Sequence, residues 1–158
     1  MITTVQIAKH FRDVHFGGNW TSANLKDQLS GLSWKQATEQ VHSFNTIATL
    51  VFHMNYYVSA VTKVLQGGPL NAKDALSFDH PPITSQADWE ALLNKTWDEA
   101  EAFALLIEAL PESKLREDLT HEKYGSYHRN LHGIIEHCHY HLGQIVLIKK
   151  LLTLGHEN

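Results

Sequence analysis

Histidines are unusually frequent in this sequence, and two pairs of them have the spacing of a helical metal site. The chain has twelve histidines, and the pairs His128/His132 and His137/His141 each stand four residues apart. Residues four apart lie on one face of a helix, so two imidazoles placed in this way can bind one ion. At this histidine frequency chance alone produces about one such pair. The spacing therefore needs a second criterion to identify a site.

The neighbours of the two pairs supply that criterion. The pair His137/His141 shares its helical stripe with isoleucines and points towards apolar surroundings. The pair His128/His132 falls in the first turns of the same helix, where helices fray and solvent reaches. Two histidines seldom suffice, because a catalytic zinc-type site takes three protein ligands and keeps a position open. The sequence therefore favours His137 and His141, with a third ligand from another helix.

His53 is the natural candidate for this third ligand. It is the only histidine in the middle of the expected second helix, whereas His42 stands near the start of that helix and His80 falls in a connection. Taken alone, His53 is an ordinary hydrogen-bonded core or boundary residue. Together with His137 and His141 it completes a three-histidine set.

The periodicity of apolar residues predicts the elements that must position these side chains. Helices are expected over residues 2–14, 34–66, 86–110 and 127–153, and no segment has the pattern of a strand. Ser33 and Gln36 form a capping box before the second helix, and Ser85 caps the third. Residues 67–84 form a long, proline-containing connection. The prediction is an all-α chain, an antiparallel four-helix bundle with a long crossover loop, in a single domain over residues 1–158.

Length and composition exclude several classes of protein. A chain of 158 residues with 43% apolar and 19% charged residues can bury a core and is neither a disordered tail nor a coiled-coil rod. No stretch approaches the roughly 18–20 apolar residues of a membrane span, and no secretory signal is visible. The formal net charge of −4 argues against a nucleic-acid or membrane partner. Cys138 is the single cysteine, so we expect a reducing, cytoplasmic location.

The last predicted helix resembles a known family. The string His137-x3-His141-x-Gly143-Gln144, with residues 131–136 before it, is similar to the last-helix signature of the DinB/YfiT-like superfamily of metalloenzymes. Residues 140–145 and the following Lys149-Lys150 are similar to its DUF1572-type branch. Asn19-Trp20 before an amphipathic segment, and His53 in a long second helix, extend the likeness over most of the chain.

The resemblance implies a four-helix bundle in which His53, His137 and His141 hold a divalent metal near one end. Zinc or nickel is the first expectation, and iron, manganese and copper also suit imidazole ligands. Water or substrate would fill the remaining positions, and Cys138 and His139 would not be ligands. The superfamily is rich in homodimers. Its known activities imply a transferase that uses a low-molecular-weight thiol or a hydrolase, with a small-molecule substrate. The alternative is a non-catalytic, dimeric metal- or ligand-binding bundle in stress response.

The sequence identifies no catalytic residue beyond this ligand set. Glu136, Glu122, Asp79 and Tyr124 are candidate general bases through nearness in sequence only, and each is better explained as a surface residue. The acidic segment 86–118, with nine Asp or Glu and three Lys or Arg, is expected to be the solvated face of a helix.

Four single residues near these motifs have expected roles. Trp20 should anchor a loop on the bundle, Cys138 should be a small core residue, and Gly143 should allow a close helix approach. Gln144 should either donate a hydrogen bond to a ligand or cap a neighbouring backbone group. The histidines outside the site are expected at the surface: His10, His15, His42, His121, His128 and His156.

Overall fold

The computed structural model describes residues 3–155, and this part of the chain is helical, with no strand. Its helices are α1 (Thr4–Phe16), α2 (Leu25–Leu29), α3 (Trp34–Thr38), α4 (Ile47–Leu65), α5 (Gln86–Ala109) and α6 (Tyr127–Gly155). The predicted all-α class is therefore confirmed. Within the same residues, no helix combines the length and apolar character needed to cross a membrane.

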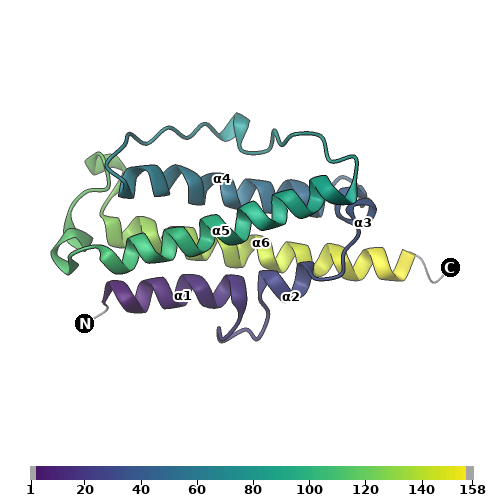
Figure 1. Cartoon of the computed structure of the whole chain (residues 1–158), viewed down its shortest axis with the longest axis horizontal. Helices are drawn as coiled ribbons and strands as arrows, with labels where there is room; N and C mark the ends of the chain where they lie inside the picture. The colour runs from purple at the N-terminus through teal and green to yellow at the C-terminus, as the bar shows by residue number, and fades with distance from the viewer. Residues whose placement is uncertain (1–2, 156–158) are drawn as a thin grey trace.

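The four long helices run side by side along the length of the molecule (Figure 1). Both α1 and α4 pack against α5 and against α6. The ring centroids of Phe11 in α1 and Phe103 in α5 are 4.8 Å apart, and both side chains are fully buried. The indole of Trp89 in α5 donates to the carbonyl of Leu32 at 3.1 Å and ties the segment between α2 and α3 to the core. The long helices thus share one apolar interior.

Local capping signals place most helix starts where the sequence predicts them. The Ser33 side chain accepts from the backbone of Gln36, whose side chain reaches back, so the predicted capping box is confirmed. The Ser85 hydroxyl accepts from the backbone N–H of Asp88 at the start of α5. Residue 2, the predicted first residue of the first helix, lies outside the described residues.

The predicted helix over residues 34–66 is wrong, because the structure has two helices there. α3 ends at Thr38, and the chain is not helical again until α4 begins at Ile47. His42 takes a positive φ of 49°, which interrupts the helical path. The Thr46 side chain then accepts from the N–H of Thr49 and starts α4 as a separate helix. Two separate helices therefore form here, each with its own cap, although the apolar pattern of the sequence looks continuous.

The connection between α4 and α5, residues 66–85, runs along α4 (Figure 1). The backbone N–H of Lys73 donates to the Tyr56 hydroxyl at 2.9 Å, and the ring of His80 lies 3.1 Å from the Thr49 hydroxyl. A short 3-10 turn forms over Asp74–Leu76. The connection is thus attached to α4 at several points along its course.

The acidic segment does more than form a solvated face. Arg12 of α1 makes ion pairs with Glu101 and Glu108 of α5, the first at 2.6 Å. The Arg12 guanidinium lowers the pKa of the Glu101 carboxyl below its usual range. These contacts link α1 to α5 at the edge of their apolar interface.

Two predictions about single residues are wrong. Trp20 is 100% exposed and anchors nothing. Its loop is held instead by Asn19, whose side-chain amide donates to the carbonyls of Asp13 and Ala23 at 2.8 and 2.6 Å. His15 is 2% exposed rather than at the surface. It lies on the core face of α1, and its Nδ1 is 3.0 Å from the carbonyl oxygen of Phe11.

Candidate metal centre

The structure brings His53, His137 and His141 together, from α4 and α6. Nε2 of His137 lies 3.0 Å from Nε2 of His53 and 3.0 Å from Nε2 of His141. One ligand atom from each residue falls within 4.8 Å of the others. His53 and His141 are buried, and His137 is half-buried. This is a three-histidine group that could hold a metal ion.

The spacing of the three nitrogens fits one ion. Two nitrogens that each bind an ion at about 2.1 Å are about 3.0–3.4 Å apart when the angle at the ion is about 90–109°. The two separations at His137, both 3.0 Å, match that range. Neutral imidazole is moreover a suitable ligand for zinc, nickel, copper and iron. The donor set and its geometry therefore agree with a divalent transition metal.

Two further side chains orient the rings of His53 and His141. The Ser77 hydroxyl donates to the Asp74 carbonyl at 2.7 Å, so it accepts from Nδ1–H of His53, 2.9 Å away. Oε1 of Gln144 is 2.6 Å from Nδ1 of His141 and also accepts a proton there. Both histidines are thereby held in the tautomer that leaves Nε2 free of a proton. Such outer hydrogen bonds are typical of metal-binding histidines.

His137 is oriented differently. Its Nδ1 is buried and has no hydrogen-bond partner among residues 3–155. Its ring instead makes an edge contact with Tyr57 of α4, with centroids 5.2 Å apart at 82°. Packing therefore takes the place of an outer hydrogen bond at the middle ligand.

The electrostatics of the site favour uncharged imidazoles. Burial, and then the charges of His141 and His53, lower the pKa of His137 to about 4. The pKa of His53 is lowered by burial and by the charge of His141, and that of His141 is lowered by burial. All three rings are accordingly neutral at pH 7, the form in which histidine binds a metal.

The connection after α4 closes one side of the site. Phe78 stacks on the His53 ring at a centroid distance of 4.0 Å and an angle of 13°. Ser77, beside it, has no exposed surface. On the helix itself, Tyr57 contacts the same ring edge-on at 5.3 Å. His53 is thus held between its own helix and the connection.

A cavity of about 540 Å³ adjoins the histidines. His53 and His137 form part of its wall, together with Tyr57, Asp74 and Arg129. The Tyr57 hydroxyl donates to the Asp74 carboxylate, and Arg129 pairs with Glu136 at 3.3 Å. A volume of this size falls in the range of about 300–1,000 Å³ that is usual for small-molecule sites. A small molecule in the cavity would lie against His53 and His137.

The other His-x3-His pair lies elsewhere. The rings of His128 and His132 are 4.5 Å apart, but His132 faces His10 of α1, with centroids at 6.4 Å. Nε2 of His132 is buried and has no hydrogen-bond partner within residues 3–155, so this residue is less exposed than its place near the helix start suggested. Its pKa is lowered by burial. The choice of His137 and His141 over His128 and His132 therefore agrees with the structure.

The candidate general bases are dispersed. Tyr124 lines the cavity and is 43% exposed. Glu136 is exposed and pairs with Arg129, and the side chains of Glu122 and Asp79 are exposed. Of this set, only Tyr124 lines the cavity beside the histidines.

Three neighbours of the motif have defined places. Cys138 is fully buried, as predicted, and burial raises the pKa of its thiol to about 12. Gln144 contacts His141, as one of its two predicted roles required, but its side chain accepts the hydrogen bond rather than donating it. The prediction for Gly143 is wrong: a Cβ built there meets nothing within 4 Å, and this position of α6 is exposed.

Sequence reasoning missed Ser77, Phe78, Tyr57 and Asp74. Tyr57 could have been found, because it follows His53 by four residues and so shares its helix face. The other three belong to the connection, and the sequence has no periodic pattern there that could predict its path. Only the packing of the connection on α4 brings them to the site.

Comparisons of the chain with protein-family models, with curated proteins and with solved structures gave no match. The functional argument therefore depends on the three histidines, their hydrogen bonds and the cavity beside them.

Proposed function

We propose that the protein binds a divalent metal ion through His53, His137 and His141 and uses it to transform a small molecule. The observation that carries the proposal is the orientation of the rings. Ser77 and Gln144 hold the Nδ1 protons of His53 and His141, so their Nε2 lone pairs converge on His137. A cavity of about 540 Å³ opens beside that point. Zinc or nickel is the first expectation for the ion.

The resemblance of the last helix to the DinB/YfiT-like superfamily supports the same proposal. The packing of α1 and α4 against both α5 and α6 supports the four-helix bundle that the resemblance implies. The reaction classes that follow from it are transfer to or from a low-molecular-weight thiol, and hydrolysis. In both, a metal with three neutral ligands supplies its full positive charge, which activates a thiolate or lowers the pKa of water towards about 7.

The residues of the cavity would bind and orient the substrate. Burial and the hydrogen bond to Asp74 raise the pKa of Tyr57, so its hydroxyl keeps its proton at neutral pH. It is therefore a hydrogen-bonding group and not a base. The Arg129 guanidinium at the cavity wall provides a positive charge for an anionic part of the substrate. Stacking of Phe78 on His53 keeps water from that side of the ring.

The alternative is a bundle that binds metal or a small ligand without turnover. The cavity at the histidines favours the enzyme, because a closed structural site has no need of a substrate-sized space. The decisive experiment is elemental analysis of the untagged protein, followed by thiol-transfer and hydrolase assays on the metal-loaded form. His137→Ala serves as the inactive variant and His139→Ala as its matched control. Absence of stoichiometric metal contradicts the proposal, and metal without turnover supports the alternative.

A further inference from the structure

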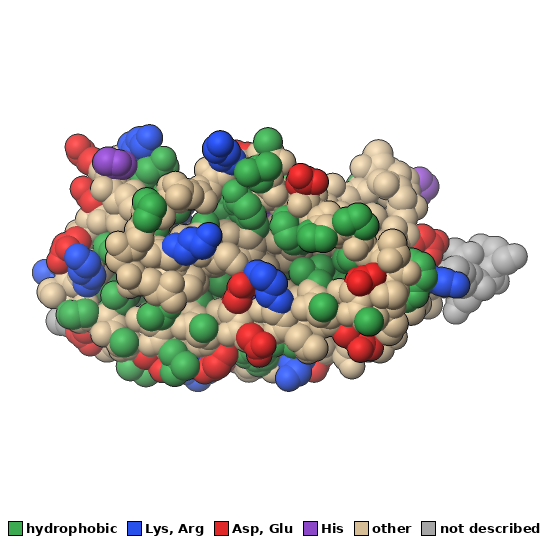
Figure 2. All heavy atoms as spheres, turned by 45° about the horizontal axis from the view of Figure 1, so that its top comes forward, with side chains coloured by type: hydrophobic (Ala, Val, Ile, Leu, Met, Phe, Trp, Pro, Cys, Tyr) green, Lys and Arg blue, Asp and Glu red, His purple; other side chains and the backbone are tan. Residues whose placement is uncertain are grey.

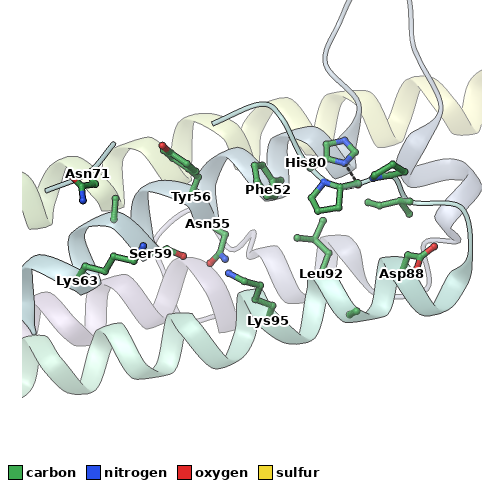
Figure 3. A pocket seen from close by; sticks show the side chains of 15 residues that line it. Phe52, Asn55, Tyr56, Ser59, Lys63, Asn71, His80, Asp88, Leu92 and Lys95 are labelled. Carbon is green, nitrogen blue, oxygen red and sulfur yellow. Dashed lines mark hydrogen bonds between the residues drawn. The ribbon is translucent and has the colours of Figure 1, made fainter. Parts of the chain in front are cut away.

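A second cavity lies on a different face of α4. It has a volume of about 470 Å³ and is bounded by α4, by α5 and by the connection between them (Figure 3). Phe52 and Tyr56 line it, whereas their neighbours His53 and Tyr57 face the metal centre. Its volume falls within the range of about 300–1,000 Å³ that is typical of small-molecule sites. The cavity is therefore a separate place for a ligand.

The lining combines an apolar stretch with a polar end. Phe52 lies near the middle of the cavity, and Leu92 lies between it and Asp88 (Figure 3). The consecutive Pro81, Pro82 and Ile83 of the connection also line the cavity. Ser59 and Lys63 lie towards the polar end (Figure 3). Phe52 and Lys63 are eleven residues apart on α4, which corresponds to about 16 Å at about 1.5 Å per residue. The shape suits an elongated ligand with one apolar and one polar end.

The charges at the polar end favour an anion. The Glu99 carboxylate is already engaged, because it accepts from Asn55 at 2.6 Å, from Ser59 at 2.5 Å and from Lys95 at 2.5 Å. Its charge therefore compensates that of Lys95. Lys63 takes part in none of the ion pairs formed among residues 3–155. The polar end is left with one uncompensated positive charge.

The remaining acid of the cavity does not neutralise this charge. Asp88 lies at the end opposite to Lys63, in the first turn of α5 (Figure 3). Its carboxylate accepts from the backbone N–H and the hydroxyl of Thr84, at 2.9 and 3.1 Å. These bonds cap the helix and keep the acid away from Lys63.

We propose that this cavity binds an elongated monocarboxylate with an apolar chain, such as a medium-chain fatty acid. The chain lies against Phe52, Leu92 and the prolines, where its burial supplies most of the free energy. The carboxylate lies near Lys63, which supplies the preference for an anion over a neutral molecule. The proposal does not depend on the metal or on the reaction at the histidines.

The test is titration calorimetry of the full chain with decanoate and, as a neutral match, decan-1-ol. We expect one decanoate per chain and weaker binding of the alcohol. Ala91→Trp fills the cavity from an exposed position on α5 and should abolish binding, whereas Ala102→Trp, exposed on the same helix outside the cavity, should not. Circular dichroism checks that both variants fold. Unchanged decanoate binding by Ala91→Trp would overturn the site.

Two charge variants test the role of Lys63. Lys63→Ala should weaken decanoate binding about two- to fivefold, the value of a partly exposed ion pair, and leave decan-1-ol binding unchanged. Lys150→Ala, at an exposed position on α6, is the matched control. His137→Ala should bind decanoate like the unmodified chain. Equal binding of acid and alcohol, with no effect of Lys63→Ala, would overturn the preference for a carboxylate.

Discussion

His53 and His137 are 84 residues apart in the chain, yet their Nε2 atoms lie 3.0 Å from one another. Ser77 already accepts the Nδ1 proton of neutral His53, so only His137 can donate in this contact. The same proton cannot also serve the contact of His137 with His141, likewise 3.0 Å. Without an ion, two nitrogen lone pairs therefore face each other in the site, and a bound cation removes that repulsion.

The first prediction concerns the ligand set. Alanine at His53, His137 or His141 should each empty the site, because two ligands seldom hold a divalent ion tightly. Alanine at His132 or His139 should leave it intact, since neither belongs to the convergent group. Bound metal per chain after dialysis measures the effect, with circular dichroism to confirm folding. A uniform small loss of metal in all five variants would indicate nonspecific binding by a histidine-rich surface.

The second prediction concerns the residues that orient the ligands. Ser77→Ala and Gln144→Leu should each weaken metal binding about 10–100-fold, because they free the ring orientation and tautomer of His53 and His141. Ser43→Ala and Gln66→Leu, at exposed positions, are matched controls. The measurement is competition with a chelator of known affinity. Equal affinity of all four variants would show that these hydrogen bonds do not tune the site.

The third prediction concerns pH. Metal binding needs neutral imidazoles, and protons compete once the pH falls below the pKa of the ligands. Burial lowers the pKa of all three histidines below the usual 6.5, and that of His137 to about 4. We therefore expect constant affinity above pH 6.5 and progressive loss between pH 6.5 and 4. Equilibrium dialysis across this range measures it, and unchanged binding at pH 4 would exclude histidine ligands.

The fourth prediction concerns His15 and acid stability. Burial lowers the pKa of His15 from the usual 6.5 to about 4, so below pH 6.5 the unfolded chain binds a proton that the folded chain does not. The free energy of unfolding should therefore fall between pH 6.5 and 4, by about 3 kcal/mol at about 1.4 kcal/mol per unit of pKa.

His15→Leu should remove this part of the pH dependence while keeping the position apolar. Urea unfolding of the metal-free protein at several pH values, compared with a control His121→Leu at an exposed site, makes the measurement. Parallel pH profiles of the unmodified chain and of His15→Leu would mean that His15 is protonated in the folded protein.

The fifth prediction concerns assembly. The resemblance to the DinB/YfiT-like superfamily implies a homodimer, and some large apolar side chains are exposed, such as Tyr140 and Leu147 on α6 at 66% and 54%. Light scattering should accordingly give about twice the chain mass of 17.9 kDa at micromolar concentration. A single species of 17.9 kDa over that range would contradict the prediction.

Short-range physics made part of this structure predictable. The start of α5 at Ser85 depends on one side chain and the backbone N–H three residues later, so the sequence reveals it directly. The pairing of His137 with His141 likewise follows from the period of a single helix. Both contacts form within one helical turn, and no other part of the chain is needed to predict them.

Tertiary structure decided how the site is completed. His53 meets His137 only because α4 packs against α6. Ser77 reaches His53 because two side chains of α4 hold the connection. Tyr56 bonds the backbone of Lys73, 17 residues further along the chain, and Thr49 bonds His80, 31 residues further along. Each of these bonds depends on where a nonperiodic segment runs, and that path is the sum of many weak long-range contacts. The sequence alone therefore identified the three histidines that meet, and only packing showed which groups orient and cover them.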